Sequence, residues 1–398
     1  MSSTDSLRLF SRRNLKIWLW GSVFSALPLT AFAQDNCQSL TDTSVILSVV
    51  TEQFYDRSFN GLNWSGEVAE TVESVACDET QGQVTARINA LLSRLGASHT
   101  AVYSAEDLEY WALNAQFHFD DLEAYALPFA GILAELDGDT WFVSAVLDGS
   151  VAARAGVRAG DALLQLNGEP FAPTGFVAGD NQLQLSSDGR STRELTLSVP
   201  AQNIMQAFVD ASQASARVLE LEADNSQSRR VGYYRIWAGR DQIQRDVQRT
   251  IDEFYDANVD ALIVDLRGGL GATSADYLAP VRYFLVRKQV SVHFLIDSSV
   301  RGGKELLASM VRRDNLGKLV GATTAGEHRP ARVNRLLGDR YFLMVATGAF
   351  PVPETGVIEG VGVAPDLAVE ACTQYCEGRD PILAASLAAL AAEPAPEP

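Results

Sequence analysis

The residues with the clearest chemical potential form a glycine-rich turn, Asp265-Leu266-Arg267-Gly268-Gly269-Leu270-Gly271, directly after an apolar run. Glycine lets a backbone approach a ligand closely, and successive backbone N–H groups in such a turn can point at one anion. The turn is therefore a candidate anion-binding site. Histidines could supply a second kind of chemistry, but His118, His293 and His328 lack the spacing of metal ligands. We expect no metal and no other cofactor.

The elements around this turn alternate between strands and helices. Residues 231–236 are typical of a strand, 241–256 of a helix and 261–265 of a buried strand. Further strand-like runs at 290–296 and 318–320 continue the series. The alternation predicts an α/β core over residues 229–372.

Three other segments have their own patterns. Residues 34–118 contain apolar residues at steps of three and four, which predicts an N-terminal helical domain whose second helix ends at Gly96. A polar stretch at 201–228 is expected to be a helical connector. Residues 373–398 are expected to form a C-terminal helix and a disordered tail rich in Ala, Pro and Glu.

Residues 119–200 change to short β-branched and aromatic runs separated by Gly and Asp turns, which predicts a β-rich module. Within it, the run from Ser150 to Asp161 followed by Leu166-Asn167-Gly168 resembles the PDZ domains of exported bacterial proteases. Such domains bind an extended peptide along a strand edge and capture its terminal carboxylate in a loop of backbone N–H groups. The resemblance implies that this peptide-binding loop is Phe129-Ala130-Gly131-Ile132.

The N-terminal sequence predicts export. Arg12, Arg13 and Lys16 precede an apolar run, and Ala31-Phe32-Ala33 matches a small-x-small cleavage site. The apolar run is short and interrupted for a membrane anchor, so we expect a signal peptide over 1–33 and no stable membrane span in the mature chain. The basic pair leaves open whether the general or the twin-arginine route is used. The predicted location is the periplasm, or the medium after secretion.

Charge and cysteine content restrict the partners and the framework. The formal net charge of −18 disfavours nucleic acid as a partner, because binding to phosphates needs clustered Lys and Arg. In an oxidising compartment four cysteines favour disulfides, and nearest pairing gives Cys37–Cys77 and Cys372–Cys376 as the most economical of three connectivities. Both would fasten ends of the fold.

The order of the core motifs identifies a family. The glycine-rich turn, the preceding Gly-Tyr-Tyr-Arg-Ile strand, Lys318-Leu319-Val320-Gly321 and the closing stretch from Glu359 to Asp366 together resemble the tail-specific (C-terminal processing) serine peptidases. With the helical segment and the PDZ-like module, the resemblance spans nearly the whole mature chain. It implies a multidomain α/β (α+β) protein: a crotonase/ClpP-like α/β core, an inserted PDZ-like module and an N-terminal helical domain. The partners it implies are unfolded polypeptides or protein C-termini.

The family's nucleophilic serine is missing from this chain. Members carry the serine at the start of a helix, three residues before a glutamate, and alignment on Glu305 places that position at Gly302. In one branch a lysine activates the serine, but the matching position holds Glu327. The serine-lysine pair is therefore absent at both ends.

A second branch, similar to the tricorn protease core, uses a histidine from a Ser-His pair and a glutamate that orients it. Ser98, His99 and Glu359 match these positions, and a histidine fixed by a carboxylate can take a serine proton near neutral pH. The resemblance implies oxyanion donors at the backbone N–H groups of Gly302 and of Gly268 or Gly269. This chain keeps the supporting residues and lacks the attacking atom.

Three hypotheses remain at this point. The favoured one is a peptidase-like protein, impaired or inactive, that binds extended polypeptides or C-termini. The second is an active serine endopeptidase in which Ser299 or Ser298 replaces the nucleophile, although a displacement of about 1 Å can cost on the order of a hundredfold in rate. The third is a carrier of hydrophobic ligands on the same fold.

Overall fold

The computed structural model describes residues 37–117, 125–222, 228–239, 241–271, 275–288, 290–351 and 356–393. The predicted signal peptide, residues 1–33, lies outside these ranges. Within them, no helix combines the length and apolar character that a membrane crossing requires.

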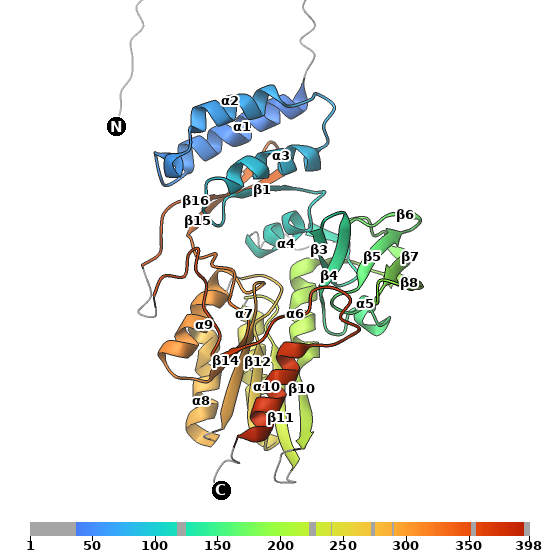
Figure 1. The fold of residues 1–398 in the computed structure, drawn as a ribbon, viewed down its shortest axis with the longest axis vertical. Helices are drawn as coiled ribbons and strands as arrows, with labels where there is room; N and C mark the ends of the chain where they lie inside the picture. The colour runs from blue at the N-terminus through green and yellow to red at the C-terminus, as the bar shows by residue number, and fades with distance from the viewer. Residues whose placement is uncertain are drawn as a thin grey trace, which may run out of the picture. The chain divides into compact units, whose positions relative to one another are not determined.

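The α/β core is built on a six-stranded sheet with the order β10-β11-β12-β13-β14-β17 (Figure 1). Its strands are β10 (Arg217–Glu222), β11 (Ser228–Arg235), β12 (Ala261–Asp265), β13 (Ser291–Ile296), β14 (Lys318–Gly321) and β17 (Leu367–Ala368). Neighbours from β11 to β17 pair in parallel, whereas β10 pairs antiparallel with β11 at one edge. All five residues of β12 are buried, as expected for a central parallel strand covered on both faces.

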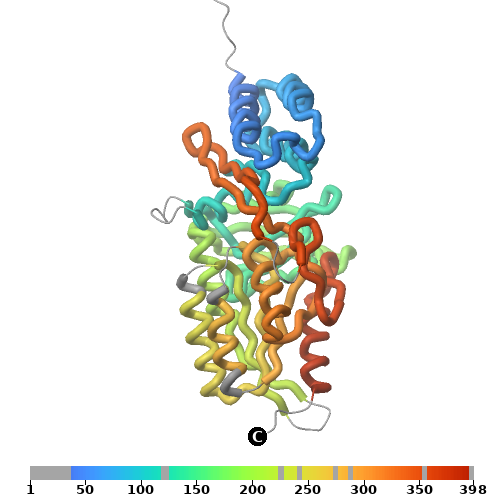
Figure 2. Tube along the Cα trace, turned by 90° about the vertical axis from the view of Figure 1, so that its left-hand side faces the viewer, coloured from blue at the N-terminus to red at the C-terminus, as the bar shows by residue number. Residues whose placement is uncertain are grey.

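Helices cover both faces of this sheet. One face packs against α6 (Ile204–Ser215), α7 (Asp241–Asp256), η3 (Ala275–Leu278), α8 (Ala279–Lys288) and α9 (Gly303–Arg313). The opposite face packs against α10 (Pro381–Ala392), the red helix of Figure 2. Successive residues of β12 divide between the two cores, Leu262 and Val264 on one side and Ala261 and Ile263 on the other.

The N-terminal helices share their hydrophobic core with a hairpin from far along the chain. This region comprises α1 (Gln38–Gln53), η1 (Phe59–Gly61), α2 (Trp64–Glu73), α3 (Gln81–Ser93), β1 (Ala101–Ser104), α4 (Leu108–Phe117), β15 (Ala331–Leu336) and β16 (Tyr341–Ala346). Strand β16 lies between β1 and β15, with Val102 opposite Leu343. Ile46, Ile88 and Val345 are fully buried together in this core. The hairpin, assigned from sequence to the α/β core, thus belongs to a separate three-stranded sheet.

The β-rich module is a five-strand antiparallel path, β3-β4-β5-β7-β8, with a short β6 beside β5. Its elements are β3 (Ile132–Asp137), β4 (Thr140–Val146), α5 (Val151–Arg154), β5 (Ala162–Leu166), β6 (Glu169–Pro170), β7 (Gly179–Ser186) and β8 (Arg193–Val199). Two short strands, β2 (Ala126–Pro128) and β9 (Ala201–Asn203), come before and after these elements in the sequence and pair antiparallel with each other. Strand β3 is at the edge of the sheet, so one of its sides has no strand partner among the residues that the structure describes.

The segment 201–228 is helical only in part, contrary to the sequence expectation. Helix α6 begins at Ile204, capped by the Asn203 side chain, but the chain then forms β10. Leu219 and Leu221 alternate along this strand and pack against the core on the α10 side. This period of two is the strand signal that the polar composition of the segment obscured.

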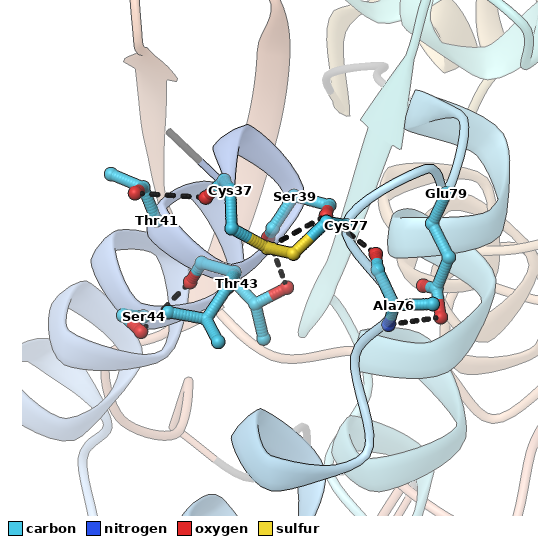
Figure 3. Close-up of a disulfide and its surroundings, with 9 residues drawn as sticks. Cys37, Ser39, Thr41, Thr43, Ser44, Ala76, Cys77 and Glu79 are labelled. Atoms are coloured by element: carbon cyan, nitrogen blue, oxygen red, sulfur yellow. Dashed lines mark hydrogen bonds between the residues drawn. A yellow bond between two sulfur atoms is a disulfide. The ribbon is translucent and has the colours of Figure 1, made fainter. Parts of the chain in front are cut away.

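Both expected disulfides are formed. Cys37 and Cys77 join the start of α1 to the segment before α3, where the Ser39 hydroxyl also donates to the Ala76 carbonyl (Figure 3). Cys372 and Cys376 close a small loop before α10. That loop packs on the β-rich module, because the Tyr375 N–H donates to the Gly160 carbonyl at 2.7 Å and the Tyr375 ring meets Phe142 edge-on at 5.3 Å.

Candidate active site

Gly302 occupies a sharp turn between β13 and α9. Its backbone has φ 59° and ψ −128°, a conformation that residues with a side chain adopt only under strain. Its N–H donates to the Glu327 carbonyl at 2.9 Å. A Cβ atom added here would lie 3.8 Å from Nε2 of His99 and 3.7 Å from the Gly271 carbonyl oxygen. The position therefore has room for a side chain that points at the imidazole.

His99 follows α3, where Gly96 ends the helix, and presents its ring to Gly302. Its Nδ1 lies 2.7 Å from the Arg329 carbonyl oxygen. Because a carbonyl can only accept, Nδ1 must carry the hydrogen, and the neutral ring then keeps its lone pair on Nε2. The imidazole is thus held in the tautomer that a general base needs, facing the side of Gly302 where a serine hydroxyl would stand.

Glu359 supports this histidine indirectly. The sequence comparison implied a direct contact with the ring, but the carboxylate accepts hydrogen bonds from the Ser98 N–H at 3.0 Å and from the Ser98 hydroxyl at 2.8 Å. It also accepts from the His328 N–H at 2.7 Å and from Nε of Arg329 at 3.0 Å. Burial raises the pKa of Glu359, but these hydrogen bonds and the Arg329 charge outweigh burial and lower it. The backbone carbonyl of Arg329, rather than a carboxylate, orients the imidazole.

Glu305, in the first turn of α9, anchors the loop that faces Gly302. Its fully buried carboxylate accepts from the Thr324 hydroxyl at 2.6 Å, the Gly326 N–H at 2.6 Å and the Glu327 N–H at 2.7 Å. The sequence used Glu305 only as a marker of the motif. In the structure it fixes the loop whose carbonyl groups contact Gly302 and His99.

The implied oxyanion donors are occupied by groups of the chain itself. The Gly268 N–H donates to the Ser299 hydroxyl at 2.7 Å, and that hydroxyl in turn donates to Asp297. The Gly302 N–H is taken by Glu327, as above. Gly269 packs so closely on the Trp237 carbonyl that an added Cβ would come within 1.8 Å of it. In this arrangement the Gly268 and Gly302 N–H groups are not free to bind an oxyanion.

In the described part of the chain, neither substitute nucleophile is hydrogen-bonded to the imidazole. Ser299 is held by Asp297 and Gly268, and Ser298 lines the cleft beside it. Glu327, at the position of the lysine in the other branch, lies 3.6 Å from the Arg301 guanidinium.

Lys304 is a buried amine that the sequence reasoning missed. It is fully buried, and its Nζ donates to the Gly268 carbonyl at 2.7 Å and the Trp237 carbonyl at 3.3 Å. Burial is the largest cause that lowers the pKa of Lys304 to about 7, and repulsion by the Arg235 charge is the second. The only sequence signal was its position between Gly303 and Glu305, on the helix that starts at the candidate site.

A cleft of about 1770 Å³ connects these groups to the β-rich module. His99, Gly268 and Gly302 line it on one side, and β3 from Leu133 onward lines it on another. The predicted peptide-binding loop does not line it: Phe129, Ala130, Gly131 and Ile132 are all buried. The Ala130 and Gly131 carbonyls accept from Ala152 and Leu147, which holds the loop against the start of α5. In the described ranges no group of His, Cys, Asp or Glu could hold a metal ion.

The lowered pKa of Lys304 predicts a specific pH dependence of stability. Because the folded-state pKa of about 7 lies below the ordinary 10.5, the unfolded chain binds one more proton between these values, and stability rises with pH across this window. We expect Lys304→Met to lower the slope of the free energy of unfolding against pH by up to about 1.4 kcal/mol per pH unit, whatever its overall stability. Denaturant unfolding between pH 7 and pH 10 measures this slope.

Lys318→Met is the matched control, because the Lys318 side chain is 55% exposed. It should keep the wild-type slope. Equal slopes for the wild type and Lys304→Met would mean that Lys304 titrates normally.

Comparisons with known proteins find similarity in two segments of the chain. The model of Peptidase family S41 matches residues 272–369, and a PDZ domain model matches residues 142–177. Carboxyl-terminal-processing peptidase 3, chloroplastic, from Arabidopsis thaliana is 20% identical over 358 residues, which cover 80% of this chain and 66% of that protein. The chain thus spans just under two thirds of the length of this relative.

The fold is shared with a solved structure, mature CPAF. Mature CPAF aligns with a TM-score of 0.51 at 12% identity over 89% of this chain and 96% of that one. The photosystem II D1 C-terminal processing protease aligns with a TM-score of 0.49 at 18% identity over 83% of this chain and 92% of that one. The chain therefore contains a segment similar to Peptidase family S41 and another similar to PDZ domains, and it is related in sequence to a C-terminal processing peptidase.

Proposed function

We propose that this chain is an exported member of the family that holds extended polypeptides or protein C-termini in its cleft and has lost hydrolysis through a serine. The observation that carries the proposal is the position of Gly302: a Cβ there would lie 3.8 Å from Nε2 of His99, yet the residue brings no hydroxyl. The base is oriented and the nucleophile is missing.

The engaged backbone donors support the same proposal. An oxyanion hole stabilises the transition state only if its N–H groups are free to point at the developing charge. Here Ser299 accepts from the Gly268 N–H, and Glu327 accepts from the Gly302 N–H. The chain therefore lacks the attacking atom, and two of its three implied oxyanion donors are engaged within the chain.

The binding half of the proposal rests on β3. This strand is at the edge of its sheet, and its residues from Leu133 to Asp137 line the cleft. A free strand edge offers a row of backbone donors and acceptors to which an extended peptide can add as a further strand. The similarity to C-terminal processing peptidases favours a polypeptide over a small hydrophobic ligand.

Export is part of the proposal and is supported by the two formed disulfides, which persist in oxidising compartments. We expect the mature chain to begin at Gln34 after cleavage behind Ala33. Mass spectrometry of the N-terminal peptide from the periplasmic fraction of a Gram-negative host measures this. Recovery of the uncleaved chain in the cytosolic fraction would contradict export.

Restoring the hydroxyl should restore cleavage. We expect Gly302→Ser to cut an unfolded protein with an apolar C-terminus, which the wild type leaves intact, because the serine Oγ would face Nε2 of His99. Adding His99→Gln should lower the rate about a thousandfold or more. Product formation followed by mass spectrometry is the measurement.

Gly302→Ala is the control for this gain. It imposes the same backbone strain, about 1–3 kcal/mol, without the hydroxyl, so both variants should be destabilised alike and only the serine variant should cut. Cleavage by the wild type, or no gain with Gly302→Ser in a folded protein, would count against the proposal.

Substitution of Ser299 distinguishes the proposed function from that of an active enzyme in which Ser299 has become the nucleophile. We expect Ser299→Ala in the Gly302→Ser background to raise kcat by up to about a hundredfold, because it frees the Gly268 N–H for the oxyanion. Ser298→Ala, which removes a neighbouring hydroxyl, is the control and should leave kcat unchanged. A loss of activity with Ser299→Ala would instead assign Ser299 to the chemistry.

A further inference from the structure

Arg235, the last residue of β11, holds a fixed guanidinium at the wall of the cleft. Its Cζ lies 3.7 Å from the centre of the Trp237 ring, and its Nε donates to the Arg267 carbonyl at 3.1 Å. The side chain is partly buried and lines the cleft. Stacking fixes the plane of the group, and the Nε bond fixes its rotation within that plane.

The two Nη groups of Arg235 have no partner among the residues that the structure describes. No carboxylate lies within ion-pair distance of this guanidinium in the described ranges, and the nearby carboxylates are engaged elsewhere. Asp265 accepts from Arg267 at 2.9 and 2.7 Å and from the Tyr233 hydroxyl at 2.8 Å. Asp148 accepts from Nε1 of Trp237 at 3.1 Å and lies 3.6 Å from Arg217.

An arginine whose Nη groups have no partner among the described residues is unexpected in this chain, which has 50 acidic residues against 32 Lys and Arg. Buried or half-buried charges are normally paired, because desolvation is costly otherwise. Arg235 is one of the charges that lower the pKa of the buried Lys304, whereas Asp265 and Asp297 act in the opposite direction. A bound anion would give the Nη groups of Arg235 the partner that the described residues do not provide.

The surroundings fit the end of a polypeptide. Gly268 lies against Arg235, since an added Cβ would meet Nη2 at 2.9 Å, so the guanidinium stands beside the glycine-rich turn. Apolar side chains line the cleft as well, among them Ala145, Ile204 and Phe208, and Phe208 stacks on Trp237. A carboxylate next to an apolar side chain is the chemistry of a C-terminal residue.

We propose that Arg235 binds the terminal carboxylate of a polypeptide held in the cleft, in place of the loop from Phe129 to Ile132. The inference rests on the proposed polypeptide binding and adds the group that recognises the chain end. The guanidinium presents its Nη hydrogens as a fork that matches the two carboxylate oxygens. The loop, in contrast, is buried and does not line the cleft.

The test compares one short apolar peptide without Asp or Glu in two forms, the free acid and the C-terminal amide. Binding to the full mature chain is measured by fluorescence anisotropy. We expect the acid to bind about tenfold to a hundredfold more tightly than the amide, because a hydrogen-bonded charge is lost in the amide. Arg235→Gln should bind both forms at the level of the amide.

Two further variants make the result decisive. Arg235→Lys keeps the charge and should retain part of the preference, which guards against a mere folding defect in Arg235→Gln. Arg190→Gln, an exposed arginine of the β-rich module outside the cleft, should behave as the wild type. A C-terminal amide of the same peptide with an internal Asp tests whether any carboxylate is sufficient. If this peptide bound as tightly as the free acid, recognition of the chain end would be overturned.

Failure of the carboxylate assignment and failure of the proposed polypeptide binding give different results. If wild type binds acid and amide equally, or if Arg235→Gln keeps the preference, the carboxylate assignment is wrong while polypeptide binding stands. If neither form binds, the proposed function fails and the assignment fails with it.

Discussion

The buried carboxylate of Glu305 is the interaction on which the candidate site depends. Removing a carboxylate from water is costly, and here three hydrogen bonds from the loop of Thr324 to Glu327 offset that cost. The loop so fixed supplies two carbonyl groups to the site: that of Glu327 to the Gly302 N–H and that of Arg329 to the His99 ring. Glu359 then ties the same loop to Ser98, so segments far apart in sequence meet at one place.

None of these bonds uses a side chain at position 302. That explains why the arrangement survives without the serine. A residue with a Cβ at φ 59° and ψ −128° stores strain of about 1–3 kcal/mol, which glycine relieves. Strained nucleophiles at a strand-to-helix turn are a known feature of hydrolases. Under the proposed function, exchange of serine for glycine would remove the chemistry and, at the same place, favour the folded state, which is a trade between stability and function.

The features that could be predicted from the sequence are those that depend on local hydrophobic pattern and on the order of motifs. The apolar run of β12 specified a buried strand, and the cysteine spacing specified the pairing. The motif around Glu305 led to Gly302, where an added Cβ would lie 3.8 Å from Nε2 of His99; its role as the nucleophile position stays a prediction. The sequence could not predict pairings that depend on the folded chain. The hairpin of β15 and β16 joins the N-terminal helices because β1 provides an edge for it, which no local period encodes. Tertiary structure also determines the partners of Glu359 and the burial of Lys304. It likewise determines which groups accept from the Gly268 and Gly302 N–H groups.

Whether the cleft serves binding or turnover depends on which interactions with a polypeptide it can make. Catalysis requires interactions that strengthen only in the transition state, whereas interactions made equally with the bound substrate only increase affinity. Under the proposed function, the missing interactions are those of the transition state: position 302 carries no hydroxyl, and Ser299 and Glu327 accept from the Gly268 and Gly302 N–H groups. Among the described residues, one side of β3 has no strand partner and the Nη groups of Arg235 are unpaired along the same cleft, so groups that would bind a polypeptide in the ground state are available. Such a cleft would favour retention of the polypeptide that it binds over its turnover.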